Sequence, residues 1–400
     1  MAGTSLTTTI RRRLYSFANQ LASPFSDSRR QDFITDMLTG LIAAGHVHLT
    51  EIARGLGGDQ TLHAAEKRLS RHLGSEHWNM SPLADELLRR SATRVTDDTL
   101  LVADTTDLAK PHARKLEGIG RVHDGSDPEG RITHGYCLFE AYVRVGTWQL
   151  FPLLIEPLKV YAGAPTGENA EFTGHLLRIH QAVGGRGTWL LDRGFDRREL
   201  YAPLVRNRLA FVVRQKGDRH VRTSDGRICS VEALVVEQRC PQPRCWPKGG
   251  QAVAIEVWLP EVSDEPFLLV VGWRYRDSER PLVLLVSPAA RRSRRTARWY
   301  IRAYLKRWGV EDATRGIKQQ FELELFLVRT WRAIRRLLWL VAWAFWWLNL
   351  WDDDNFHTLR DAVMNHPSRL RKTVTYLFNW IATLLRQLLH PAPAPLYNTG

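Results

Sequence analysis

The chain has 400 residues, of which 44% are hydrophobic and 24% charged, and it carries 56 Lys and Arg against 42 Asp and Glu. This length is enough for two or three domains with a sizeable core. The net charge of +14 indicates a polyanionic partner, with nucleic acid first and an acidic membrane second. Four cysteines are too few for a disulfide framework and favour a reducing cytoplasm, and the N-terminus shows no apolar segment of a secretory signal.

Residues 1–95 are predicted to form a helical domain. Apolar residues recur with a helical period from Gln31 to Ala44, and Thr50 and Asp59 are suited to cap two further helices on either side of a glycine pair. A short helix, a glycine turn and a basic helix are typical of a helix-turn-helix. The basic residues that we expect to contact DNA are Lys67, Arg68 and Arg71. A helical bundle with a solvated basic face fits the same pattern.

The pattern then changes to apolar runs alternating with helical segments, which predicts an α/β core from 96 to 214. Two short apolar runs, 99–103 and 188–191, read as buried strands that end at Asp104 and Asp192. Between them we expect a polar loop from Asp107 to Gly135. The other expected elements are a hairpin of 136–145 with 148–157, helices over 170–182 and 198–207, and a strand over 210–214.

Residues 215–280 are rich in Val, Ile and Trp and are predicted to form an all-β insertion. The core returns over 281–350, beginning with a strand at 281–287. The apolar stretch 337–351 has 15 residues, short of the roughly 20 that a membrane span needs, so we predict a buried helix. Residues 351–400 read as a helical region and a loose tail. Cys229, Cys240, Cys245 and His220 are spaced too loosely to favour a zinc site.

Four polar residues share one face of a predicted helix over 304–318. On an ideal helix Tyr304, Arg307, Glu311 and Lys318 fall within roughly 60° of one another. A carboxylate among cations can hold a divalent metal and a phosphate together, although a solvated face with salt bridges gives the same pattern. The glycines at 309 and 316 lie inside this helix, and a kink at either one would spoil the common face.

Two or three carboxylates suffice to hold the metal ions of phosphodiester cleavage. Two divalent ions can activate the attacking oxygen and stabilise the leaving one, and Mg²⁺ prefers hard oxygen ligands. An acidic residue that closes a strand is more often a turn former or a cap. Asp104, Asp192 and Glu311 are therefore weak candidates singly and stronger ones as a set.

The spacing Y-x2-R-x3-E-x6-K, together with LVADTT at the first aspartate and LLDRGF at the second, resembles the DDE transposases of bacterial insertion sequences, the YREK-signature (IS4-like) group. The resemblance covers roughly 95–350 and implies an RNase H-like core interrupted by the β insertion. It implies that Asp104, Asp192 and Glu311 are catalytic and hold Mg²⁺ or Mn²⁺, with two ions in the site. Tyr304, Arg307 and Lys318 would hold phosphates from an exposed helix face.

The resemblance also implies double-stranded DNA as the partner, at transposon ends and at the target, a homodimer in the synaptic complex, and a bacterial cytoplasmic protein associated with the nucleoid. In relatives that form DNA hairpins, a tryptophan of the insertion stacks on a flipped base. The candidates here are Trp246, Trp258 and Trp273, with Trp273 preferred. Two other functions fit the sequence: a DNA-binding regulator on a transposase scaffold, and a host nuclease with an RNase H-like core.

Overall fold

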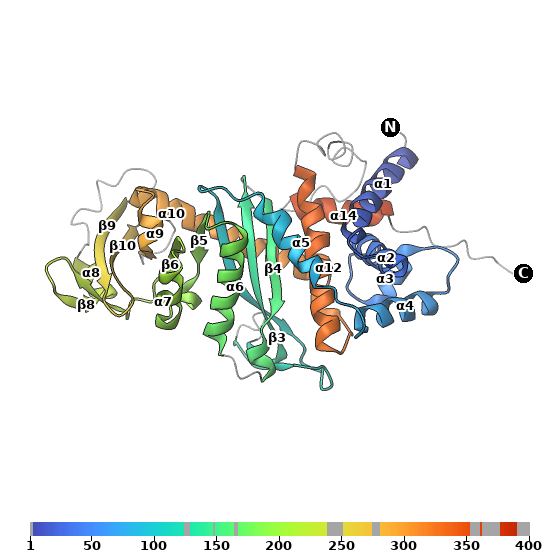
Figure 1. Cartoon of the computed structure of the whole chain (residues 1–400), viewed down its shortest axis with the longest axis horizontal. Coiled ribbons are helices and arrows are strands. Elements are labelled where there is room, and N and C mark those ends of the chain that lie inside the picture. The colour runs from blue at the N-terminus through green and yellow to red at the C-terminus, as the bar shows by residue number, and fades with distance from the viewer. Residues whose placement is uncertain are drawn as a thin grey trace, which may run out of the picture.

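The computed structural model describes residues 3–123, 129–146, 149–163, 167–237, 251–273, 281–352, 361 and 377–389. In Figure 1 the N-terminal helices lie at one end of an elongated molecule, a long mixed sheet occupies the centre, and the strands of the predicted insertion form the other end. Buried side chains from all three regions belong to one continuous hydrophobic cluster. The sheet is therefore the element that connects the two ends.

The N-terminal residues form helices, as the periodicity predicts. They are α1 (Gly3–Ala22), α2 (Ser28–Ala44), α3 (Leu49–Leu56), α4 (Leu62–Gly74) and α5 (Ser81–Ala92). Two predicted caps are wrong. Helix α3 begins after His48 rather than at Thr50, and α4 is capped by Thr61, whose side chain accepts a hydrogen bond from the Ala64 amide, rather than by Asp59. A hydroxyl three residues before that amide satisfies it better than the more distant carboxylate.

The sheet joins strands from most of the remaining chain. Its members are β1 (Leu100–Ala109), β2 (Gly120–His123), β3 (Ile132–Val145), β4 (Gln149–Pro157), β5 (Thr188–Leu191), β6 (Phe211–Arg214), β7 (His220–Thr223), β8 (Ile228–Ser230), β9 (Gln251–Leu259), β10 (Ser263–Trp273) and β11 (Leu282–Val286). The order runs β2-β3-β1-β5-β6-β11-β10-β9-β7-β8, with β4 also paired to β3. Strands β1, β5 and β6 are parallel, and the other pairs are antiparallel.

Some predictions in this region are confirmed and one is wrong. The hairpin of β3 with β4 forms, as do helices α6 (Glu168–Ala182) and α7 (Arg198–Arg206). The loop predicted from Asp107 instead contains the end of β1, all of β2 and the start of β3. These polar residues are extended because they pair with one another at the sheet's edge, which outweighs their weak local preference.

The segment predicted to be all-β contains a helix, α8 (Val231–Glu237). Its apolar residues Val231, Leu234 and Val235 follow a helical spacing and are buried, and the Ser230 hydroxyl accepts a hydrogen bond from the Ala233 amide at its start. Capping and one-sided burial override the β preference of its valines. The neighbouring β9, β10 and β11 continue the central sheet rather than forming a separate one.

The apolar helix α12 (Trp331–Asn349) is a core element, as predicted. It packs against β4 and against α2 and α4, and almost all of its residues from Ile334 to Leu348 are buried. No helix in the part of the chain that the structure describes is long and apolar enough to cross a membrane. Helix α14 (Leu377–Leu389) packs against α2 and α12.

Two adjacent arginines of α12 face different parts of the molecule. Arg335 donates to both carboxylate oxygens of Glu156 on β4, at 2.9 and 3.1 Å. Arg336 is buried and donates to the carbonyls of Leu73, Ser75 and Trp78, at and after the end of α4. Because a guanidinium complements the negative end of a helix, Arg336 fixes α4 to α12.

The predicted single helix over 304–318 consists of three pieces. They are α10 (Ala297–Leu305), a 3₁₀ turn at Lys306–Trp308 and α11 (Gly309–Gln320). The irregular turn precedes Gly309, where a Cβ atom would lie 2.6 Å from Nη1 of Arg144. That guanidinium donates to the Lys306 carbonyl at 2.9 Å, and glycine at 309 leaves room for it in this position. At Gly316 the helix continues without a break.

Candidate active site

Asp104 and Asp192 lie side by side on neighbouring parallel strands. Residues 100–103 of β1 pair in register with 188–191 of β5, so the next residue on each strand is one of the two aspartates. Adjacent strands are about 4.8 Å apart, which brings the two carboxylates to one place on the sheet. Asp192 also begins the turn after β5, where its Oδ1 accepts a hydrogen bond from the Gly194 amide at 2.8 Å.

Asp104 does not end its strand, contrary to the sequence-based prediction. Strand β1 continues to Ala109 because 104–109 remain paired with 135–140 of the long β3. Asp104 therefore projects from the middle of β1, and its carboxylate Oδ1 accepts a hydrogen bond from the Thr105 amide at 2.9 Å. The strand that carries Asp104 is longer than the apolar run because pairing, not hydrophobicity, extends it.

Arg307 connects the first aspartate to Glu311. Its Nη1 donates to Asp104 Oδ2 at 2.7 Å, and its Nη2 donates to Glu311 Oε1 at 2.8 Å. The Arg307 side chain is 8% exposed, while the Glu311 side chain is 51% exposed. One guanidinium thus lies between two of the three candidate carboxylates, and the third, Asp192, is close enough to influence both Asp104 and Arg307 electrostatically.

Burial, with a smaller contribution from the charge of Asp192, raises the pKa of the Asp104 carboxyl to about 6 against the opposing effect of Arg307. Two neighbouring carboxylates that share one cation carry excess negative charge, which favours a proton or a second cation. The arrangement is therefore electrostatically suited to bind a metal ion.

The donor set fits a divalent metal, with one structural condition. All three carboxylates supply the hard oxygens that Mg²⁺ and Mn²⁺ prefer. Among the described residues, however, no three His, Cys, Asp or Glu side chains converge closely enough to hold an ion. Arg307 separates Glu311 from Asp104. Arg307 engages one oxygen of Asp104 and one of Glu311, so a shared ion would have to approach through the remaining oxygens or displace the guanidinium.

Tyr304 and Lys318 are placed differently from the prediction of one exposed face. Tyr304 is 4% exposed, its ring lies 5.9 Å from the guanidinium carbon of Arg307, and burial raises its pKa to about 12. Lys318 lies beyond Glu311 on α11, where its ammonium donates to the Asp107 carbonyl and lies 3.6 Å from Glu324. The 3₁₀ turn at 306–308 lies between Tyr304 and α11, but Leu305, Lys306, Trp308 and Gly309 all keep right-handed helical dihedrals, and Tyr304 lies beside Arg307.

Sequence reasoning missed a fourth carboxylate at the site. Glu140 of β3 lies directly opposite Asp104 in the antiparallel register, so both side chains share one face of the sheet. It is 1% exposed and accepts a hydrogen bond from the Thr314 hydroxyl of α11 at 2.6 Å. Burial raises its pKa to about 7. The available signal was a single acidic residue within a strand that is otherwise almost continuously apolar.

The basic residues of α4 divide into two kinds. Lys67 and Arg71 are exposed and lie four residues apart, on the outer face of the helix. Arg68 instead forms an ion pair with Asp36 of α2, 2.6 Å between Nη2 and Oδ2. The predicted contact of Arg68 with DNA is therefore unfavourable, because that side chain is already engaged in holding α4 against α2.

The preferred tryptophan of the insertion is buried. Trp273, at the end of β10, is 8% exposed and belongs to the hydrophobic cluster, so stacking on a base would require it to leave that packing. Trp258 on β9 is partly buried. Trp246 lies outside the described residues, as do Cys240 and Cys245.

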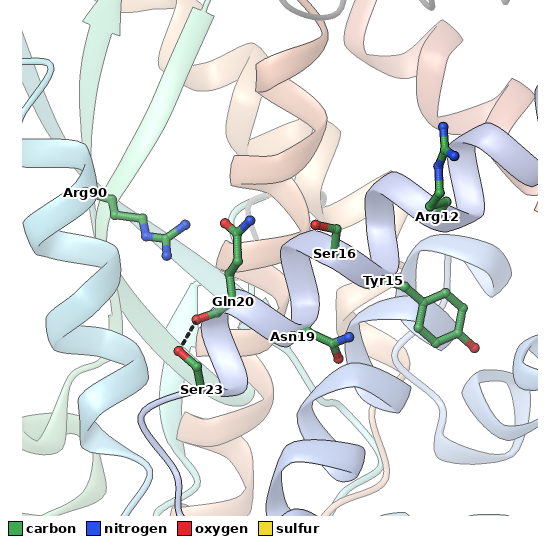
Figure 2. A pocket seen from close by; sticks show the side chains of 7 residues that line it. All are labelled: Arg12, Tyr15, Ser16, Asn19, Gln20, Ser23 and Arg90. Carbon is green, nitrogen blue, oxygen red and sulfur yellow. Dashed lines mark hydrogen bonds between the residues drawn. The ribbon is translucent and has the colours of Figure 1, made fainter.

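A polar hollow of about 790 Å³ lies between α1 and α5, remote from the carboxylates. Figure 2 shows Arg12 and Arg90 at opposite sides of it, with Tyr15, Asn19 and Gln20 of α1 between them. Its described lining includes no carboxylate, and the chain has no acidic residue before Asp27. Arg90 is bonded to Glu86, whereas Arg12 is exposed and makes no ion pair with any described residue.

Residues 164–347 match a family model described as "Transposase DDE domain". The match includes Asp192, Arg307, Glu311 and Lys318, and Asp104 lies before it. It supports a DDE transposase as the class of this protein. No curated protein matches the sequence.

One solved structure similar to this chain is described as "Cryo-EM structure of piggyBac transposase synaptic complex with hairpin DNA (SNHP)". It is 13% identical, with a TM-score of 0.46, and the alignment covers 95% of this chain and 77% of that one. That TM-score is low, and the function proposed below is based on the side chains of the site and on the family model.

Proposed function

We propose that this protein is a transposase of the YREK-signature group, which cuts DNA at the ends of a mobile element and joins the freed ends to a target. The observation that carries the proposal is the position of Arg307 between Asp104 and Glu311, with Asp192 beside Asp104 on the neighbouring strand. A regulator that only binds DNA gains nothing from carboxylates that repel phosphate. The match of 164–347 to the transposase domain adds independent support.

The strand order supports an RNase H-like core. Strands β4, β3 and β1 form an antiparallel meander, and β5 and β6 extend it in parallel beyond β1. In this arrangement the aspartates lie on the central pair of strands. We retain 1–95 as the DNA-binding domain, 96–214 and 281–350 as the core, 215–280 as the insertion and 351–400 as the C-terminal region.

In the proposed reaction a water oxygen attacks the phosphorus at the end of the element, and the bond to the 3′ oxygen breaks. The products are a 5′ phosphate and a 3′ hydroxyl, which takes up a proton as the water loses one. That 3′ hydroxyl then attacks a phosphorus of the target DNA or of the opposite strand. The new bond to phosphorus forms as the bond from that phosphorus to its own 3′ oxygen breaks, and the leaving 3′ oxygen takes up the proton that the attacking hydroxyl loses. Two Mg²⁺ or Mn²⁺ ions, when bound, would supply charge neutralisation for the attacking and leaving oxygens.

The chain's own residues have separate tasks in this proposal. Asp104 and Asp192 would hold the metal ions from the sheet, and Glu311 would complete their ligands from α11. Arg307, once released from Asp104, is placed to hold a phosphate oxygen beside the scissile bond, where charge develops. Buried Tyr304 would keep the Arg307 side chain in place, and Lys318 would fix α11 to β1.

DNA would be held outside the catalytic centre by two surfaces. The outer face of α4, with Lys67 and Arg71, would contact the ends of the element. The hollow between α1 and α5 offers guanidinium, hydroxyl and amide groups, which are the side chains that most often contact DNA phosphates (Figure 2). Two protomers would hold two ends in one synaptic complex.

The decisive experiment incubates the purified protein and Mg²⁺ with a plasmid that carries the coding region and its natural flanking DNA. We expect double-strand cuts at the element's two ends, followed by insertion into a second plasmid. Cutting without joining would indicate a nuclease, and binding without cutting would indicate a regulator. Either result would overturn the proposal.

A further inference from the structure

Glu140 differs from the other carboxylates of the core. Three Glu or Asp side chains in the described ranges are at most 5% exposed: Glu140, Glu156 and Asp196. Glu156 is bonded to Arg335 and Asp196 to Arg219. Glu140 makes no ion pair with any described residue and has the Thr314 hydroxyl as its partner. The charge of Lys318 acts on Glu140 without forming an ion pair with it. A buried carboxylate that lacks an ion pair is costly, so a compensating role is expected for it.

We propose that Glu140 is a positioning residue, which holds α11 and therefore Glu311 in place against the aspartate strand by accepting the Thr314 hydroxyl. This inference rests on the proposed function for its importance to catalysis, but the contact itself does not depend on it. Glu140 lies opposite Asp104 on β3, and Thr314 lies one turn after Glu311 on α11. The bond therefore joins the strand beside one candidate ligand to the helix that carries another.

Three side chains of this helical segment form hydrogen bonds with the sheet, in addition to the bond from Arg144 of β3 to the Lys306 carbonyl. In chain order the three bonds join Arg307 to Asp104, Thr314 to Glu140 and Lys318 to the Asp107 carbonyl. At 1.5 Å per residue they are spaced at roughly 10 Å and 6 Å along the segment. These three contacts lie on one side of the segment. Together they fix both the rotation of the helix about its axis and its distance from the sheet.

The Thr314–Glu140 bond differs from the Arg307–Asp104 bond in the groups that it uses. The bond of Arg307 with Asp104 uses an oxygen of a candidate metal ligand, and in the proposed function it is released. The Thr314–Glu140 bond uses neither a candidate ligand nor a group that contacts DNA. It can therefore keep α11 in register after Arg307 has moved. An apolar pair at these positions would fill the space but would not fix the helix rotation, because dispersion contacts are not directional.

The test compares acceptor and donor substitutions that keep or remove this bond. Glu140→Leu and Thr314→Val remove it while retaining side-chain volume. Glu140→Gln and Thr314→Ser retain an acceptor and a donor. Gln319→Ala, on the exposed side of α11, is the matched control. Two quantities are measured: amide hydrogen exchange over 309–320 in metal-free protein, and the rate of strand cleavage with the affinity for end DNA determined separately.

We expect Glu140→Leu and Thr314→Val each to speed exchange in α11 by about tenfold and to slow cleavage by at least about tenfold, with DNA affinity unchanged. The double variant should be no worse than either single one. Glu140→Gln, Thr314→Ser and the control should match the wild type. Native exchange in Thr314→Val, or additive effects in the double variant, would overturn the proposal.

The exchange measurement separates this inference from the proposed function. If the wild type does not cleave DNA, the proposed function fails, and exchange in α11 still decides whether Glu140 holds the helix. If Glu140→Leu does not fold, Thr314→Val carries the test, because Thr314 is only partly buried and its hydroxyl alone is replaced.

Discussion

Two buried acidic clusters in this protein show opposite ways of treating a carboxylate. The Asp196 cluster, between α7 and the strands β6 and β7, satisfies its carboxylate fully. Oδ1 accepts from the Tyr201 hydroxyl at 2.7 Å and twice from Arg219, at 3.0 and 2.6 Å. Oδ2 accepts from the Lys216 amide at 2.8 Å. Both oxygens have donors, so this cluster holds the start of the insertion onto the core.

The cluster around Asp104 leaves negative charge uncompensated. It contains Asp104, Asp192, Glu140 and Glu311, and Arg307 is the one cation that forms an ion pair with any of them in the described part of the chain. Burial is the main cause that raises the pKa of Asp104 and that of Glu140, and neighbouring carboxylates raise both further against the opposing charges of Arg307 and Lys318. The comparison teaches that a satisfied carboxylate stabilises the fold, whereas an unsatisfied group of them prepares a place for a cation.

The largest expected effect comes from the cluster with excess charge. Asp104→Asn, Asp192→Asn and Glu311→Gln should each reduce strand cleavage to the background of the assay, because each removes a metal ligand and no positive charge. DNA affinity should persist in a gel-shift assay. Wild-type cleavage by any one of the three variants would exclude that residue from the catalytic set.

The second effect concerns the satisfied cluster. Asp196→Ala should lower the free energy of unfolding by about 3–5 kcal/mol, because it leaves the buried Arg219 without its partner. Urea denaturation measures the change, and Asp59→Ala on the surface is the control, with a change below about 0.5 kcal/mol. If Asp196→Ala were as stable as the control, the Asp196 cluster would not stabilise the fold, and the distinction between a structural and a functional cluster would be wrong.

The third prediction tests whether Arg307 contributes both to the stability of the fold and to catalysis. Arg307→Ala should slow cleavage by about 100-fold, or about 2.7 kcal/mol of barrier. An exposed phosphate ligand would leave the melting temperature unchanged. Arg307 is buried between carboxylates, so we expect a clear fall in the melting temperature of the metal-free protein. Added Mg²⁺ should reverse part of that fall. An unchanged melting temperature would mean that Arg307 does not neutralise the cluster.

The fourth effect applies the same distinction to the basic residues of α4. Lys67→Ala and Arg71→Ala should weaken DNA binding and reduce its salt dependence by about 0.9 in slope for each phosphate that is no longer neutralised. Arg68→Ala should leave the slope unchanged and reduce stability, since Arg68 is paired with Asp36.

For the hollow between α1 and α5, Arg12→Glu should weaken DNA binding more than Arg206→Glu, an equal charge change on α7 at the far side of the molecule.

The smallest effect is a dependence of stability on pH. The folded-state pKa values of Asp104 and Glu140 are raised, to about 6 and about 7, from ordinary values of 3.8 and 4.5. Protonated carboxyls therefore contribute stability that is complete below about pH 4 and is lost as the pH rises through both folded pKa values. With a chelator present, the melting temperature should fall from about pH 5 to about pH 8. Glu140→Gln should flatten the upper part of that fall, and an unchanged profile would contradict the raised pKa.

The sequence predicts one part of this site well. Asp104 and Asp192 follow apolar runs of four or five residues between turn signals, which are consistent with buried strands and too short for a typical helix. The interval of four residues from Arg307 to Glu311 likewise identifies one helical face, and the two side chains do meet. Local pattern was sufficient because these relations are set by period and spacing.

The remaining features depend on contacts between distant residues. Glu140 is recognisable as a site residue only from the register that places it opposite Asp104. Arg68 forms an ion pair with Asp36, which lies on another helix, and its contact with DNA stays a prediction. The interruption before Gly309 follows from the approach of Arg144 on another element. None of these relations has a local signal, so periodicity could not reveal them.

The consecutive arginines of α12 have a mechanical consequence. Arg335 is bonded to β4 of the sheet and Arg336 to the end of α4. Helix α12 therefore connects α4, the proposed DNA-contacting helix, directly to the sheet that carries Asp104. This connection does not pass through a flexible linker that would have to become ordered on binding. DNA held by α4 would be presented to the carboxylates at a fixed distance and angle, and part of the entropy of aligning the scissile bond would be lost during folding rather than during each reaction.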